Sequence, residues 1–257
     1  MTFLFLLFLL KRIIYKVFTI HYSLMPHMEE AYVYLDGGYH SKISKHLGEG
    51  VHLKVDMKQF GITLAKQNKL WCSKVFYYTA PPYVGSNPNN EEKKKRADYD
   101  RFAHIMKKIP DFCFREGRCQ KAEDDYNQKG VDTLITMDLM EMCKNKKIKN
   151  IVILTSDTDF VPILNKLKDD FGINVTLAYY CDFVRNGNFS MSNHLWACCN
   201  NKFLISKKHF DLSKRKKKDE SIVSTEKPNE QPQDSTPKVA KTPENTTEKT
   251  EQSEQSK

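Results

Sequence analysis

The stretch ILTSDTDFVP, residues 153–162, places two aspartates directly after an apolar run and then returns to apolar residues. Residues 148–154 are too continuously apolar for a strand with a solvated face, so they predict a strand buried on both faces. Such strands belong to parallel sheets, in which binding sites form at the carboxyl ends of the strands. Charges that serve only solubility can lie anywhere on the surface, so solubility does not explain why Asp157 and Asp159 stand at the end of this strand. A bound cation would explain it, because it requires carboxylates close together.

Strand-like and helix-like segments alternate along residues 31–205. Short runs rich in β-branched and aromatic residues are separated by segments in which apolar residues such as Met57, Phe60 and Leu64 recur at helical spacing. This alternation predicts an α/β fold in which helices cover both faces of a central, mainly parallel sheet. The expected strands are residues 31–35, 71–79, 111–115, 148–154, 173–178 and 203–205, and the expected helices are residues 55–69, 91–108, 131–143 and 160–169.

The two ends of the chain differ in composition from the α/β part, which predicts a domain over residues 28–212. In residues 1–27 an apolar run of about ten residues ends at Lys11 and Arg12, too short to span a membrane and unlike a signal peptide. This segment is either a weak interfacial anchor or is not made, with translation starting at Met25 or Met28. Residues 213–257 are Lys-rich and then polar, which predicts a disordered tail.

The net charge and the cysteine content of the chain indicate which partners and which classes of protein fit it. The net charge of +9 favours an acidic partner such as nucleic acid, although much of the lysine lies in one run near the C-terminus. The seven cysteines are odd in number and contain no C-x-x-C pair. They argue against a disulfide scaffold and a structural zinc site, and predict a cytoplasmic location without stable membrane insertion.

Further aspartates fall on the predicted edge of the sheet. Asp36 ends the first expected strand before a Gly-Gly pair, and Asp132 begins an expected helix on the same edge. With Asp157 and Asp159 they form a set of carboxylates that repel one another unless a hard cation is bound. Such a cation suits phosphate chemistry. Each aspartate could instead serve only a turn or a helix cap, and Asp138 is expected to form a salt bridge or hydrogen bond away from the site.

Three motifs in this order resemble one known family over residues 31–205. They are YVYLDGGY (residues 32–39), KGVDTLITMDLM (residues 129–140) and ILTSDTDFVPIL (residues 153–164), the last followed by GINVTL (residues 172–177). Together they resemble the NYN domain, in the LabA-like branch of the PIN-like ribonucleases. The resemblance implies a PIN-like three-layer α/β/α fold and a metal-dependent ribonuclease.

The resemblance also implies roles for individual residues. Mg²⁺ or Mn²⁺ would be held by Asp36, Asp132 and Asp157, and Asp159 would position a ligand or the attacking water. Thr155, Ser156 and Thr158 are expected to hydrogen-bond these carboxylates as their supporting groups. Two departures bear on activity: Tyr39 stands where many relatives carry asparagine, and Asn200 and Asn201 stand near the final strand, where relatives often have an acid.

Basic residues near the predicted edge are candidates for RNA phosphate contacts. They could equally form a solvated helix face, and the tail run at residues 214–218 could be a tether or plain solvated chain. Tyr39 or Tyr126 is a candidate for stacking on a base. The RNA-binding candidates are Lys93, Lys94, Lys95, Arg96, Arg115 and Lys129, with Arg118 and Lys121 nearby.

Other functions remain to be weighed against a ribonuclease. The main alternative is a non-catalytic RNA-binding or regulatory adaptor that keeps the fold. A sugar-nucleotide transferase would leave Asp36 and Asp132 unexplained, and a phosphatase with Asp157 as nucleophile would need more foldable sequence after it. The sequence leaves open the RNA substrate, the number of metals and whether the chain forms homo-oligomers.

Overall fold

The computed structural model describes residues 28–122, 125–142, 148–182, 189 and 192–214 of the chain. The apolar and basic segment 1–27 and the tail from residue 215 onward lie outside the described residues, as does Cys143. The boundaries predicted for these two terminal segments therefore stay predictions. Within the described residues no helix is both long and apolar enough to cross a membrane.

A six-stranded sheet forms the centre of the fold, and every strand in it is parallel to its neighbours. The strand order is β3-β2-β1-β6-β7-β8, so the chain builds outward from β1 in one direction and then, from β6, in the other. This confirms the predicted α/β fold with a central parallel sheet. The strands are β1 (Glu29–Asp36), β2 (Leu70–Thr79), β3 (Phe112–Glu116), β6 (Asn150–Leu154), β7 (Asn174–Tyr179) and β8 (Asn201–Leu204).

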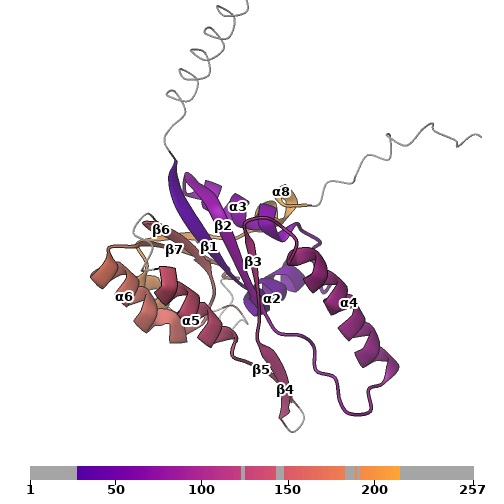
Figure 1. Ribbon diagram of the computed structural model, residues 1–257. Coiled ribbons are helices and arrows are strands. Elements are labelled where there is room, and N and C mark those ends of the chain that lie inside the picture. The colour runs from indigo at the N-terminus through magenta and orange to yellow at the C-terminus, as the bar shows by residue number, and fades with distance from the viewer. Residues whose placement is uncertain (1–27, 123–124, 143–147, 183–188, 190–191, 215–257) are drawn as a thin grey trace, which may run out of the picture. The chain divides into compact units, whose positions relative to one another are not determined.

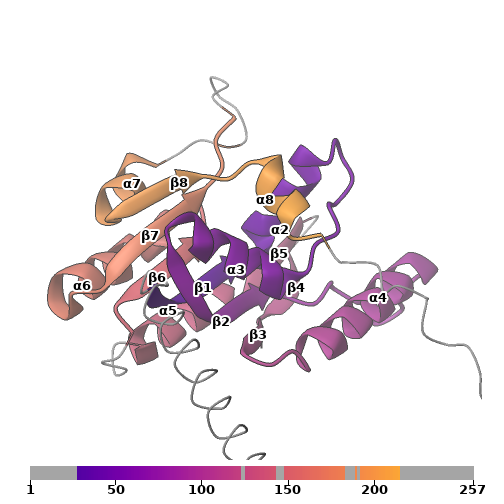
Figure 2. The same cartoon turned by 90° about the horizontal axis from the view of Figure 1, so that it is seen from above.

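Helices cover the two faces of the sheet and make the fold three-layered (Figures 1 and 2). Their apolar faces contribute to two separate clusters of buried side chains, one on each side of the sheet. An antiparallel hairpin, β4 (Arg118–Ala122) with β5 (Asp125–Lys129), lies apart from the sheet. On one side are α2 (Gly37–Leu47), α3 (Met57–Gln67), α4 (Asn90–Met106) and α8 (Lys207–Leu212), and on the other α5 (Val131–Met142), α6 (Val161–Phe171) and α7 (Asn193–Cys198).

Successive side chains of the central strands point alternately to the two faces of the sheet and so belong to two different core clusters. Val33 and Leu35 of β1 pack with Val152 of β6 on the α2 and α3 side, whereas Tyr34 and Ile153 pack on the α5 and α6 side. All of these side chains are buried, because successive residues of a strand point to opposite faces and both faces are covered. This explains why the sequence shows apolar runs instead of polar alternation.

Helix α2 begins where the sequence predicted only a strand end and a turn. Asp36 caps it, and its Oδ1 accepts hydrogen bonds from the backbone N–H groups of Gly38 (2.9 Å) and Tyr39 (3.1 Å). Gly37 is required by close packing, since a Cβ atom there would lie 2.4 Å from the carbonyl oxygen of Tyr78 on β2. The Gly-Gly pair therefore starts a helix against the neighbouring strand, and β4, β5, α7 and α8 were likewise not predicted.

We expect the substitution Gly37→Ala to destabilise the fold by about 1–3 kcal/mol, the usual cost of overpacking. Alanine is a better helix former than glycine, so a loss of stability would arise from the contact with Tyr78. Gly85→Ala is the matched control, because its added Cβ atom would meet only ordinary contacts at 3.7 Å or more. Urea unfolding of both variants measures the difference, and equal stability of the two would contradict this account of Gly37.

Candidate active site

Asp36 and Asp157 follow the two central strands at the point where the strand order reverses. Asp36 is the last residue of β1, and Asp157 lies three residues beyond the end of β6. These strands pair in parallel, with Leu35 opposite Leu154, so their carboxyl ends meet at one edge of the sheet. In open α/β sheets this reversal point is where ligand-binding crevices form.

The loop after β6 is held by its own short hydrogen bonds. Asp157 caps the 3-10 helix η1 (Thr158–Phe160), and its Oδ1 accepts a hydrogen bond from the N–H of Asp159 (2.8 Å). The N–H of Asp157 donates in turn to Oγ1 of the buried Thr155 (3.1 Å). The side chain of Phe160 is buried and anchors the loop in the core. The two aspartates are thus presented by a fixed turn.

The expected support of the carboxylates by the neighbouring hydroxyl groups stays a prediction, since these groups make other contacts in this structure or are exposed. Thr155 acts on the backbone of Asp157 and not on a carboxylate. Ser156 and Thr158 are exposed, and among the described residues neither donates a hydrogen bond to one of the four aspartates. In this turn the N–H of Asp159 already occupies one oxygen of the Asp157 carboxylate.

The four aspartates influence one another electrostatically. Burial raises the pKa of the Asp36 carboxyl above its usual value of 3.8, hydrogen bonds from Tyr39 and Gly38 oppose the rise, and repulsion from Asp132 and Asp157 adds to it. The pKa of Asp132, near the start of α5, is raised by burial and by repulsion from Asp157 and Asp159. Asp36 is thus within electrostatic range of Asp132 and Asp157, and Asp132 is within range of Asp157 and Asp159.

The donor set at this edge suits a hard cation, but the side chains do not converge as they stand. Among the described residues, no three His, Cys, Asp or Glu side chains are placed so that they could hold a metal ion. Asp36 and Asp157 instead turn Oδ1 toward backbone N–H groups. Carboxylates are the ligands that Mg²⁺ and Mn²⁺ prefer. Metal binding at this edge would thus require the free carboxylate oxygens to turn toward one another.

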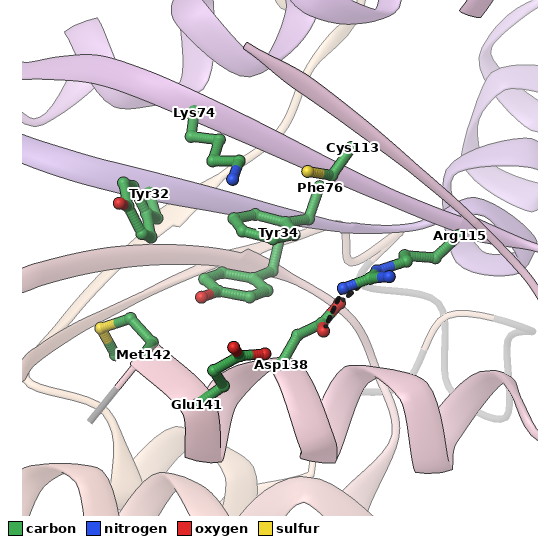
Figure 3. Close-up of a pocket in the computed structure, with 9 residues that line it drawn as sticks. All are labelled: Tyr32, Tyr34, Lys74, Phe76, Cys113, Arg115, Asp138, Glu141 and Met142. Atoms are coloured by element: carbon green, nitrogen blue, oxygen red, sulfur yellow. Dashed lines mark hydrogen bonds and ion pairs between the residues drawn. The ribbon is translucent and has the colours of Figure 1, made fainter. Parts of the chain in front are cut away.

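Asp138 on α5 takes the structural role that its position in the sequence predicts. Its carboxylate accepts hydrogen bonds from Arg115 at 2.7 and 2.9 Å and from the Tyr78 hydroxyl at 2.8 Å. Figure 3 shows Arg115 in contact with Asp138, and both side chains line a cavity of about 460 Å³ on the α5 side of the sheet. None of the four aspartates lines this cavity. Arg115, expected to contact RNA, is thus engaged in an ion pair.

Two of the four basic residues at positions 93–96 of α4 also form ion pairs within the protein. Lys95 pairs with Glu91 (2.7 Å), and Arg96 pairs with Asp100 (2.9 Å), in each case four residues away on the same helix. Such pairs stabilise a solvated helix face, which was the alternative interpretation of this run. Lys93, Lys94 and, at the end of β5, Lys129 are exposed.

Tyr39 does not serve as an exposed stacking platform. Its ring is buried, and its hydroxyl donates to the carbonyl oxygen of Tyr180 (3.2 Å) and accepts from the Tyr180 N–H (3.0 Å). Burial raises the pKa of Tyr39 to about 12. This tyrosine therefore ties the start of α2 to the segment that follows β7. The side chain of Tyr126, the other stacking candidate, lies outside the described residues.

Asn200 and Asn201, which stand near the final strand where relatives often have an acid, lie away from the aspartates. Asn200 and Asn201 lie at the amino edge of the sheet, where Asn200 accepts a hydrogen bond from the N–H of Val175 (2.9 Å). Asp182 instead follows the end of β7 on the carboxyl edge, and its charge contributes, after burial, to the raised pKa of Tyr180. The sequence analysis did not single out Asp182, which lies four residues past the predicted strand 173–178.

The model of the NYN domain matches residues 31–207. The chain belongs to the NYN domain family. NYN domains are generally predicted to be ribonucleases, so membership indicates an RNA-related function. A search of curated proteins found no match. Among solved structures, a protein of unknown function from Vibrio parahaemolyticus is similar, with 16% identity, a TM-score of 0.47, and coverage of 70% of this chain and 94% of that one.

The raised pKa of Asp36 gives a testable pH dependence of stability. Because the folded-state pKa lies above 3.8, stability is lost as pH rises through the interval from 3.8 to that raised value. Asp36→Asn keeps a residue suited to a helix cap and removes the charge. We therefore expect this variant of the NYN domain to be more stable than the parent at neutral pH, with the gain disappearing below about pH 4.

Asp138→Asn is the matched control, since it also neutralises one aspartate. It should destabilise the protein by about 1–3 kcal/mol, because Arg115 and Tyr78 lose their charged acceptor. Unfolding in urea at several pH values compares the two variants with the parent. A loss of stability in Asp36→Asn at neutral pH would contradict the electrostatic description of the site.

Proposed function

We propose that this NYN domain is a metal-dependent ribonuclease that hydrolyses phosphodiester bonds at Asp36, Asp132, Asp157 and Asp159. The observation that carries the proposal is the placement of Asp36 and Asp157 at the ends of β1 and β6, at the reversal point of the sheet. There burial, and after it repulsion from the neighbouring aspartates, raises the pKa of Asp36 and Asp132. Their like charges are unfavourable for the folded protein alone. A bound cation relieves that cost, and clusters of perturbed carboxyl groups are typical of functional sites.

The proposal assigns separate tasks to the four residues. Asp36, Asp132 and Asp157 would hold Mg²⁺ or Mn²⁺, which when bound lowers the pKa of a water ligand and offsets charge on the phosphate. Backbone N–H groups of Gly38 and Tyr39 already restrain Asp36. Asp159 is exposed at the turn, where its carboxylate can accept a proton from the attacking water.

A non-catalytic RNA-binding adaptor is the second candidate. The observation in its favour is that the carboxylates, within the described residues, do not converge on a metal position. An adaptor would bind RNA without cutting it, and neutralising an aspartate would leave its function unchanged. The two candidate functions therefore differ in whether the bound RNA is cleaved.

The setting proposed for either function is the cytoplasm, with RNA as partner and residues 28–212 as the folded unit. The cysteines in the described part of the chain support this compartment, because all six are free thiols. We also propose the LabA-like branch as the place of this chain within the NYN family, on the three motifs described above.

The test is cleavage of labelled single-stranded and structured RNAs by the full chain with Mg²⁺, with Mn²⁺ and with chelator. We expect metal-dependent cleavage that falls at least about 100-fold in Asp157→Asn, since even indirect supporting groups of a metal contribute 10–100-fold. RNA binding by this variant should be kept or improved, because one negative charge is removed from the site.

Asp169→Asn on α6 is the matched control, since this aspartate is exposed and lies near the other edge of the sheet. It should cleave at the parental rate. Binding without cleavage in either metal, by folded protein, would establish the adaptor instead. Equal cleavage by the Asp157→Asn and parental proteins would place the active site elsewhere.

A further inference from the structure

A second concave surface lies beside α2, the helix that begins at Asp36. It is a cavity of about 610 Å³ lined by Lys42, Lys45, His46, Glu49, Gly50 and Phe189. Lys42 and Lys45 lie six and nine residues beyond Asp36, or about 9–14 Å along the helix axis. Three basic side chains and one carboxylate, that of Glu49, therefore line a hollow within a short distance of the acidic site.

The two lysines of this cavity differ from Lys95 and Arg96 of α4. Among the described residues neither Lys42 nor Lys45 has a carboxylate within ion-pair distance. Both side chains are exposed. In α4, by contrast, Lys95 and Arg96 are paired within the helix. The charges at the α2 cavity are thus available to an external anion.

Aromatic contacts connect this cavity to the acidic edge. Nε2 of His46 and the hydroxyl of Tyr180 are hydrogen-bonded at 3.1 Å, and the rings of both residues pack on Phe189, with centroids 4.9 and 5.0 Å away. The backbone of Tyr180 holds the hydroxyl of Tyr39, three residues after Asp36. The cavity wall and the start of α2 are therefore parts of one packed unit.

We infer that the α2 cavity is a phosphate-binding subsite for the RNA strand whose scissile bond lies at the four aspartates. The inference rests on the proposed function and specifies how that site retains a polyanion. The four carboxylates repel RNA, so cations beside them must supply the attraction. Lys42 and Lys45 would contact phosphates flanking the scissile bond, which strengthens binding without reading the base sequence.

Helix stabilisation offers a simpler explanation for part of this cluster. Lys45 and His46 lie in the last turn of α2, where positive charge interacts favourably with the helix dipole. Lys42 lies a turn earlier, outside the reach of that effect. The dipole explanation predicts a change in stability when the lysines are removed, and no change in the salt dependence of RNA binding.

The experiment compares Lys42→Ala/Lys45→Ala with the parent, both carrying Asp157→Asn to prevent cleavage. Binding of a short labelled single-stranded RNA is measured over a series of salt concentrations. Each lost phosphate contact lowers the slope of log K against log salt by about 0.7. For the two lost contacts we expect the slope to become about 1.4 less steep. When the salt concentration is lowered tenfold, the affinity of the double variant for RNA should then increase about 25-fold less than the affinity of the parent. This difference should be the same for every RNA sequence tried.

The matched control is Lys66→Ala/Lys149→Ala, which removes the same charge at the amino edge of the sheet, at the end of α3 and before β6. Its slope should equal that of the parent. A slope unchanged in the α2 variant, or lowered equally in both, would overturn the subsite. Cleavage by the wild-type chain decides the proposed function separately: cleavage with an unchanged slope refutes only the subsite, and a lowered slope without cleavage refutes only the nuclease.

Discussion

The parallel pairing of β1 with β6 is the constraint on which the rest of this structure depends. It joins two segments more than a hundred residues apart and sets Leu35 beside Leu154 in the middle of the sheet. Both strands are buried on both faces, so a slip of one residue would move each side chain out of the core cluster into which it packs and into the opposite one. Asp36 and Asp157, which follow these strands, are consequently held at one edge even though their charges repel each other.

Local hydrogen bonds hold the like charges in place. Asp36 caps α2 and Asp157 caps η1, and in both cases one carboxylate oxygen is satisfied by backbone N–H groups. A cap of this kind contributes about 1 kcal/mol, while burial and repulsion act against the ionised form of Asp36. The site thus combines local stabilisation with an electrostatic cost, a combination typical of functional sites.

The distribution of positive charge complements this acidic edge. Basic residues on α4 and β3 are largely balanced by acids of the same fold, as in the Arg115–Asp138 pair. The lysines of α2 have no such partner in the described part of the chain. Because α2 starts at Asp36 itself, the element that positions the acid also carries the cations beside it. Attraction for a polyanion and the acidic site are in this way coupled through one helix.

The sequence alone determined the fold class and the NYN family, because apolar runs, turn residues and short motifs are local patterns. It did not show that Gly37 and Gly38 begin a helix, since that depends on the approach of β2 to the turn. The pairing of Arg115 with Asp138 and the burial of Tyr39 are contacts between distant segments. Only the tertiary structure decided them, because packing and partner charges come from elements that the local sequence does not contain.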